Sequence, residues 1–212
     1  MDSTTQKTKS WLALGDSYTI GEQVPLHESF PYQTLQLLRN AGLSFYAPEI
    51  VAKTGWTTDE LNEQLNHAKF LTGYDMVTLL IGVNNQFRGR NWYEYKLEFM
   101  HLLHKAIGFA SGRSENVYVL SIPDWGVTPF AKDRETERIA MEIDKYNEQC
   151  KLVTEELGCH YLDITGSQRV DGSNTAFLAT DGLHPSGQEY AKWAKTLFEA
   201  ITNKAIAINL PV

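Results

Sequence analysis

The chain has 212 residues, of which 42% are hydrophobic and 21% are charged, and it carries a formal net charge of −7. This length suits one globular domain with a substantial core, so we expect a single domain over residues 1–212. The acidic balance argues against a nucleic-acid partner and against an anionic membrane surface, because both require clustered lysine and arginine side chains.

The cysteines and the first residues bear on the cellular compartment of the protein. The first ten residues contain no apolar segment of a secretory signal, and no apolar run reaches the length of a membrane span. Cys150 and Cys159 are too few and too unpatterned for a disulfide framework or a zinc site, so we expect both to be buried and reduced. These features favour a cytoplasmic protein without membrane insertion and leave the oligomeric state open.

Short apolar runs bounded by glycine, proline or asparagine predict five strands. They span residues 11–14, 49–52, 76–81, 117–120 and 160–163. The run at 76–81 is the most apolar of them, which is typical of a strand covered on both faces.

Helical periodicity separates these strands. The first helix is predicted to start at Pro31 and to stop at residues 40–42, because residues 35–43 carry apolar side chains at helical spacing. Further helices are predicted over residues 92–110, 135–157 and 188–201, and another opens at the capping box 57–60. We expect the segments 124–130 and 165–180 to be loops. The alternation predicts an α/β fold, a three-layer flavodoxin-like sandwich whose parallel sheet of about five strands has the order 2-1-3-4-5.

Three residues suited to acyl chemistry follow the first three predicted strands. Ser17 comes just after the first strand, Gly55 after the second and Asn84 after the third. The strand order makes these strands neighbours, so the residues should meet at the carboxyl edge of the sheet, where open α/β folds bind ligands. A serine flanked by a backbone amide and a side-chain amide suits attack on a carbonyl, because both donors stabilise the oxyanion that forms.

A serine nucleophile needs a base, and the chain contains six histidines. His184 lies on a glycine- and proline-containing turn before the last predicted helix, with Asp181 three positions earlier. Such a turn can place the pair over the strand ends, with Asp181 holding His184 in the tautomer that takes a proton from Ser17. His27, in the loop after Ser17, stays an alternative base. The other histidines lie inside predicted helices or a strand, where packing and surface roles are commoner: His67, His101, His104 and His160.

Each candidate also has a purely structural interpretation. Ser17 or Asp16 suits a helix N-cap, and Gly55 suits the end of a strand. Asn84 suits a turn, and His184 suits a buried ring bonded to a carbonyl. Taken singly these motifs are weak evidence, but their joint placement at one sheet edge favours catalysis.

Four short motifs carry a resemblance to a known family. They are Gly15-Asp16-Ser17-Tyr18, Lys53-Thr54-Gly55-Trp56, Gly82-Val83-Asn84-Asn85 and Asp181-Gly182-Leu183-His184. On these motifs the chain resembles the SGNH hydrolases, also called GDSL esterases and lipases, from Trp11 to the last predicted helix. The resemblance implies Ser17 as nucleophile, completed by Asp181 and His184, and an oxyanion hole of the Ser17 and Gly55 amides with the Asn84 side chain. It also implies the same fold and no metal or organic cofactor.

Two positions depart from the pattern of that family. Tyr18 replaces the leucine of the family name, which changes the packing behind the nucleophile. Asn85 replaces the aspartate that commonly follows the oxyanion asparagine, so the group that orients Asn84 has to be found elsewhere.

Aromatic side chains on the loops after the second, third and fourth strands are candidates for the substrate pocket. Trp56, Phe87 and Trp125 are the first candidates, with Trp92 beside them, and core packing is an equal alternative for each. Arg88 suits a contact with a polar or anionic part of the substrate, although surface arginines are commoner.

The sequence predicts a serine acyl-hydrolase that cleaves carboxylic esters of small molecules or lysolipids through a Ser17 acyl-enzyme. Deacetylation of carbohydrates, or hydrolysis of acyl thioesters at the same site, is the first alternative. A non-enzymatic flavodoxin-like protein that binds a phosphate or flavin after the first strand is the second. Asp16 and Glu22 would repel a phosphate there, and the Asp181–His184 pair would have no role.

Overall fold

The computed structural model describes residues 7–208, with side chains described as far as residue 203. One parallel sheet holds five strands in the order β2-β1-β3-β4-β5, as predicted. The strands are β1 (Trp11–Asp16), β2 (Glu49–Lys53), β3 (Met76–Leu80), β4 (Val117–Leu120) and β5 (His160–Leu162).

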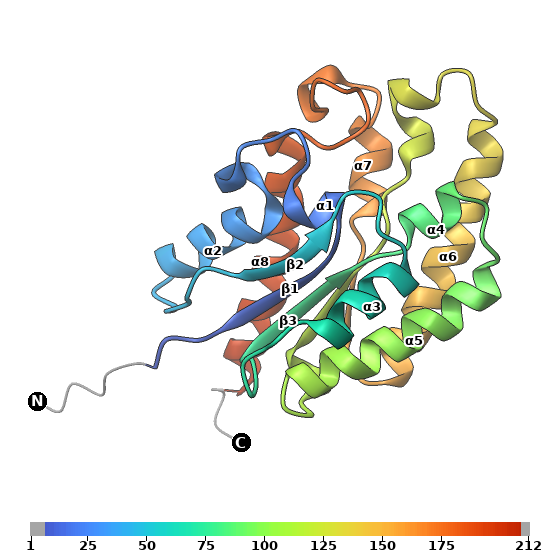
Figure 1. Cartoon of the computed structure of the whole chain (residues 1–212). Coiled ribbons are helices and arrows are strands. Elements are labelled where there is room, and N and C mark those ends of the chain that lie inside the picture. The colour runs from blue at the N-terminus through green and yellow to red at the C-terminus, as the bar shows by residue number, and fades with distance from the viewer. Residues whose placement is uncertain (1–6, 209–212) are drawn as a thin grey trace, which may run out of the picture.

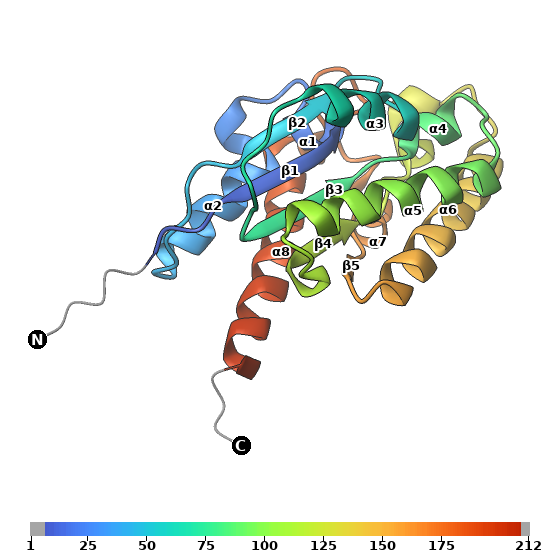
Figure 2. The ribbon, with the colours of Figure 1, turned by 60° about the horizontal axis from the view of Figure 1, so that its bottom comes forward.

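The α-helices of the described residues connect and follow these strands. They are α1 (Ser17–Ile20), α2 (Phe30–Asn40), α3 (Thr58–His67), α4 (Val83–Phe87), α5 (Trp92–Phe109), α6 (Thr136–Glu156), α7 (Thr165–Asp171) and α8 (Gly187–Ile208). Helices α2 and α8 pack together on one face of the sheet, while α3, α5 and α6 cover the other (Figures 1 and 2). The result is the predicted three-layer sandwich.

Strand β1 supports the candidate site, because Ser17 follows it directly. All six of its residues are buried, and the Trp11 indole Nε1 donates to Thr78 Oγ1 of β3 at 3.1 Å. The strand was expected to stop before Gly15, but it continues to Asp16 because these two residues pair with the end of β2. This register brings the carboxyl ends of β1 and β2 level, so the loops that follow both strands start from one edge.

The two predicted loops are partly helical, which corrects the sequence prediction. Residues 124–130 contain 3₁₀ turns at Trp125–Val127 and Pro129–Ala131, and residues 165–180 contain α7 and a 3₁₀ turn at Thr175–Phe177. Helix α7 begins at Thr165, whose hydroxyl donates to the Ile122 carbonyl at 2.8 Å. Contacts of this kind come from distant parts of the chain and leave no local pattern.

Two sequence expectations concern the interior and the membrane. Cys150 and Cys159 are buried and free, as expected. Over residues 7–208, no helix is both long enough and apolar enough to cross a membrane.

Candidate active site

Ser17 is the first residue of α1, directly after β1, and only 4% of it is exposed. Asp16 is the N-cap, because its Oδ1 accepts a hydrogen bond from the Tyr18 amide at 3.0 Å. The first amides of a helix lack intrahelical acceptors, so the Ser17 N–H is a potential donor to a ligand. The capping interpretation of Asp16 is therefore confirmed, and it places the Ser17 hydroxyl at the carboxyl edge of the sheet.

One cavity of about 160 Å³ brings four of the predicted catalytic and oxyanion residues together. Ser17, Gly55, Asn84 and His184 all line it, although they come from four separate loops or helix starts. The remaining lining residues are Tyr18, Thr54, Val83, Phe87, Trp125 and Leu183. The wall is predominantly apolar.

Gly55 has a backbone conformation that favours glycine, with φ of +83°. Its carbonyl oxygen accepts a hydrogen bond from Arg88 Nη2 at 2.7 Å, and Arg88 Nη1 is paired with Glu60 Oε1 at 3.3 Å. Arg88 therefore ties the loop of Gly55 to the end of α4 and to α3. It does not line the cavity, and its contacts in this structure are with protein groups.

Asn84 lies in α4, with its side chain directed toward two oxygen acceptors. Its Nδ2 donates to the Trp56 carbonyl at 3.0 Å and lies 3.5 Å from Asp16 Oδ2. These contacts orient the Asn84 amide without help from the following residue. The Trp56 side chain is partly buried against the core and does not line the cavity.

Asn85 forms its hydrogen bonds with Thr58, at the start of α3. Its Oδ1 accepts the Thr58 amide at the start of α3 at 3.1 Å, and its Nδ2 donates to Thr58 Oγ1 at 2.6 Å. The Thr58 hydroxyl in turn donates to a carboxylate oxygen of Glu98 on α5. Asn85 thus joins three helices behind Asn84.

His184 and Asp181 form a close pair. Asp181 Oδ2 lies 2.6 Å from His184 Nδ1, and Asp181 Oδ1 accepts the Leu183 and His184 amides, each at 3.0 Å. Burial raises the pKa of Asp181, but the hydrogen bonds from His184 and the two amides outweigh it and hold that pKa below its ordinary value. A charged, acceptor-only carboxylate fixes the proton of His184 on Nδ1 and leaves Nε2 as the basic nitrogen. The Tyr18 ring, with its centroid 5.1 Å from that of His184, packs against the imidazole.

The other predicted residues divide between the cavity and its surroundings. Phe87 and Trp125 line the cavity, whereas Trp92 lines a different one. His27 lies in a short 3₁₀ turn with its side chain 72% exposed, and it does not line the cavity of Ser17. The sequence did not single out Val83 and Leu183 as lining residues, although each belongs to one of the four motifs.

A bound metal ion would require a cluster of ligating side chains. Within residues 7–208, no group of three or more histidine, cysteine, aspartate or glutamate side chains is arranged to hold a metal ion.

The sequence model described as "GDSL-like Lipase/Acylhydrolase family" matches residues 13–192. The chain belongs to this family. Membership in the GDSL-like family supports ester hydrolysis as the general reaction. A search of curated protein sequences finds no match.

Three solved structures share the fold of this family member. A lipase/acylhydrolase from Enterococcus faecalis is 20% identical, with a TM-score of 0.72 over 93% of this chain and 97% of that one. Axe2, an acetylxylan esterase from Geobacillus stearothermophilus, is 17% identical, with a TM-score of 0.72 over 91% and 94%. TesA is 14% identical, with a TM-score of 0.69 over 92% and 99%.

Proposed function

We propose that this GDSL-like family member is a serine acyl-hydrolase that cleaves carboxylic esters of small molecules or lysolipids. Ser17 Oγ attacks the ester carbonyl carbon while His184 Nε2 takes the hydroxyl proton. The bond to the alcohol oxygen breaks as His184 returns the proton to that oxygen, which leaves an acyl group on Ser17. A water molecule then attacks the acyl carbon, with His184 as base, and releases the acid and free Ser17.

The observation that carries this proposal is the convergence of Ser17, Gly55, Asn84 and His184 on one cavity. The pairing of Asp181 with His184 Nδ1 supports His184 as base, because it leaves Nε2 with the lone pair. The Ser17 and Gly55 amides and the Asn84 side chain are neutral donors, which suits them to a developing oxyanion.

The substrate alternatives share this site. Deacetylation of a carbohydrate is supported by the acetylxylan esterase, which is one of the similar folds. The small volume of the cavity also favours a short acyl group. Hydrolysis of an acyl thioester would use the same attack, with a thiolate as leaving group. Family membership favours all of these over the binding of a phosphate or a flavin.

The decisive experiment replaces the nucleophile. Ser17→Ala should abolish turnover of p-nitrophenyl acetate while the folded structure is retained, because the hydroxyl forms the acyl-enzyme bond. Ser29→Ala, which alters a buried serine outside the cavity, should keep its activity. Mass spectrometry after treatment with an alkyl phosphonate fluoride should show one adduct, on Ser17. Undiminished turnover in Ser17→Ala, or labelling of another serine, would exclude the proposed mechanism.

A further inference from the structure

Trp125 is a largely buried residue in the wall of the site cavity, with 6% of it exposed. Its backbone carbonyl accepts a hydrogen bond from Thr128 Oγ1 at 2.7 Å. The rings of Phe87 and Phe130 stand edge-on to the indole, with centroids 5.1 and 6.1 Å away. These contacts hold the backbone and the sides of the ring, and the polar end of the indole is held separately.

Gln86 holds the indole N–H. It lies in α4, is only 4% exposed, and its Oε1 accepts Trp125 Nε1 at 2.7 Å. Its Nε2 donates to Glu142 Oε2 of α6 at 2.8 Å. An indole only donates and a carboxylate only accepts, so a single orientation of the Gln86 amide satisfies both neighbours. The ring of Trp125 is therefore fixed by a buried side chain whose own orientation is determined.

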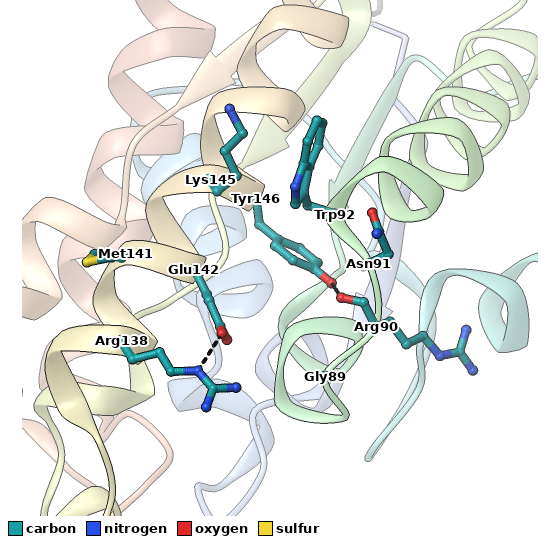
Figure 3. Close-up of a pocket in the computed structure, with 9 residues that line it drawn as sticks. All are labelled: Gly89, Arg90, Asn91, Trp92, Arg138, Met141, Glu142, Lys145 and Tyr146. Carbon is teal, nitrogen blue, oxygen red and sulfur yellow. Dashed lines mark hydrogen bonds and ion pairs between the residues drawn. The ribbon is translucent and has the colours of Figure 1, made fainter.

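Glu142 is the outer end of this chain of hydrogen bonds. Its Oε1 accepts Arg138 Nε at 2.8 Å, and Figure 3 shows the two side chains of α6 meeting in the wall of a second cavity, of about 330 Å³. Burial raises the pKa of Glu142, but the hydrogen bonds from Arg138 and Gln86 hold it below its ordinary value. Glu142 therefore presents a charged acceptor to Gln86 at neutral pH.

The site cavity is small and partly open to solvent. Pockets that enclose drug-sized ligands measure about 300–1,000 Å³, whereas this cavity measures about 160 Å³. Its wall is apolar and includes Val83, Phe87 and Leu183 beside Trp125. We propose that Trp125 limits the length of the acyl group that the enzyme accepts, and that Gln86 is the positioning residue that holds the indole where it does so. This inference rests on the proposed ester hydrolysis, and within it selects short-chain esters of small molecules over lysolipids, whose acyl groups are long.

The first test changes the wall. A series of p-nitrophenyl esters from acetate to palmitate should show that the wild-type enzyme prefers short acyl groups. Trp125→Ala should raise the ratio of kcat/KM for octanoate to kcat/KM for acetate by about tenfold or more, because each methylene that gains apolar contact contributes to discrimination. An unchanged ratio in a folded Trp125→Ala enzyme would overturn the proposal.

The second test asks whether Gln86 acts through the indole N–H. Gln86→Met keeps the length of the side chain but offers the indole N–H only a weak thioether acceptor, so the octanoate-to-acetate ratio should rise in the same direction. Trp125→Phe removes the N–H, so adding Gln86→Met to it should change the ratio by less than about twofold. Equal effects of Gln86→Met in both backgrounds would overturn the positioning role of Gln86.

A matched control separates this role from general packing. Gln149→Met also replaces a buried helical glutamine, on α6, but outside the cavity, and it should leave the ratio unchanged. The two proposals fail in different ways. If the wild-type protein hydrolyses no ester of the series, the proposed function is wrong; if it hydrolyses esters with a ratio insensitive to Trp125, only this inference is wrong.

Discussion

Asp16, directly before Ser17, is fully buried. Burial raises its pKa to about 7, because it outweighs the hydrogen bonds from the Tyr18 and Asp16 amides, which lower it. In the unfolded chain an aspartate titrates near pH ~3.9. Between the two values the folded protein binds a proton that the unfolded chain releases, so this residue lowers the free energy of unfolding as pH rises.

Asp16→Asn removes this titration and keeps a side-chain acceptor for the N-cap. Relative to the variant, the wild-type protein should lose about 4 kcal/mol of unfolding free energy between about pH 4 and pH 8, since the pKa shift is about three units. Urea denaturation near pH 4, 6 and 8 measures the difference. Asp133→Asn, at an exposed position, is the control substitution. A pH-independent difference between Asp16→Asn and wild type would show that Asp16 is ionised throughout.

At the scale of elements, helices long enough to show periodicity were predictable and short ones were not. The capping box at Thr57 correctly predicted the start of α3, and apolar spacing correctly predicted α5 and α6. Helices α1 and α4 are too short to show a period, and each depends on distant partners. The side chains of α4 bond to α3, α6 and the Trp125 turn, so only tertiary structure defines that helix.

The link between α3, α4 and α5 explains how this chain accommodates asparagine after Asn84. Asn85 is fully buried and donates to Thr58 Oγ1, while Thr58 donates onward to Glu98. An aspartate at position 85 has no hydrogen to donate, and its charge would lie beside Glu98, whose Oε2 is 3.5 Å from Asn85 Nδ2. The carboxylate at this junction is therefore supplied by α5 and the amide by α4.

Asn85→Asp should accordingly destabilise the protein by about 2–3 kcal/mol, because it places an unpaired, like-charged group in the interior. Adding Glu98→Gln places the carboxylate at position 85 and the amide at position 98, and should restore most of the lost stability. Glu98→Gln alone should have a smaller effect than Asn85→Asp. A double-mutant cycle by urea denaturation measures the coupling. Strictly additive effects of the two substitutions would contradict the junction described here.

Over the whole molecule, the strand order could be predicted because helices alternate with strands and right-handed crossovers leave few arrangements. That order was enough to anticipate the meeting of Ser17, Gly55 and Asn84 at one cavity. The supports of the site could not be anticipated in the same way. Gln86 and Glu142 are 56 positions apart, and a single hydrogen bond between two helices produces no periodicity in sequence.

The same order places contacts that pair the central strands at the edge opposite the candidate site. At the amino edge, opposite the candidate site, Asp75 Oδ2 accepts the Ser10 amide at 2.9 Å and the Ser10 hydroxyl at 3.2 Å, just before β3 and β1 begin. Asp75→Ala removes both acceptor contacts without touching the cavity, since Asp75 does not line it. The hydrogen bonds therefore contribute to the pairing of the central strands and not to the chemistry.

We expect Asp75→Ala to lower the free energy of unfolding by about 1–2 kcal/mol, and the Tm by about 2–8 °C, with kcat/KM for p-nitrophenyl acetate unchanged at 25 °C. Ser17→Ala, at the carboxyl edge, should show the reverse: activity lost and Tm nearly unchanged. Calorimetry and steady-state kinetics on the two variants measure both quantities. Loss of activity in folded Asp75→Ala would mean that the amino edge is coupled to the site, because every cavity residue is supplied by segments beyond the carboxyl ends of the strands.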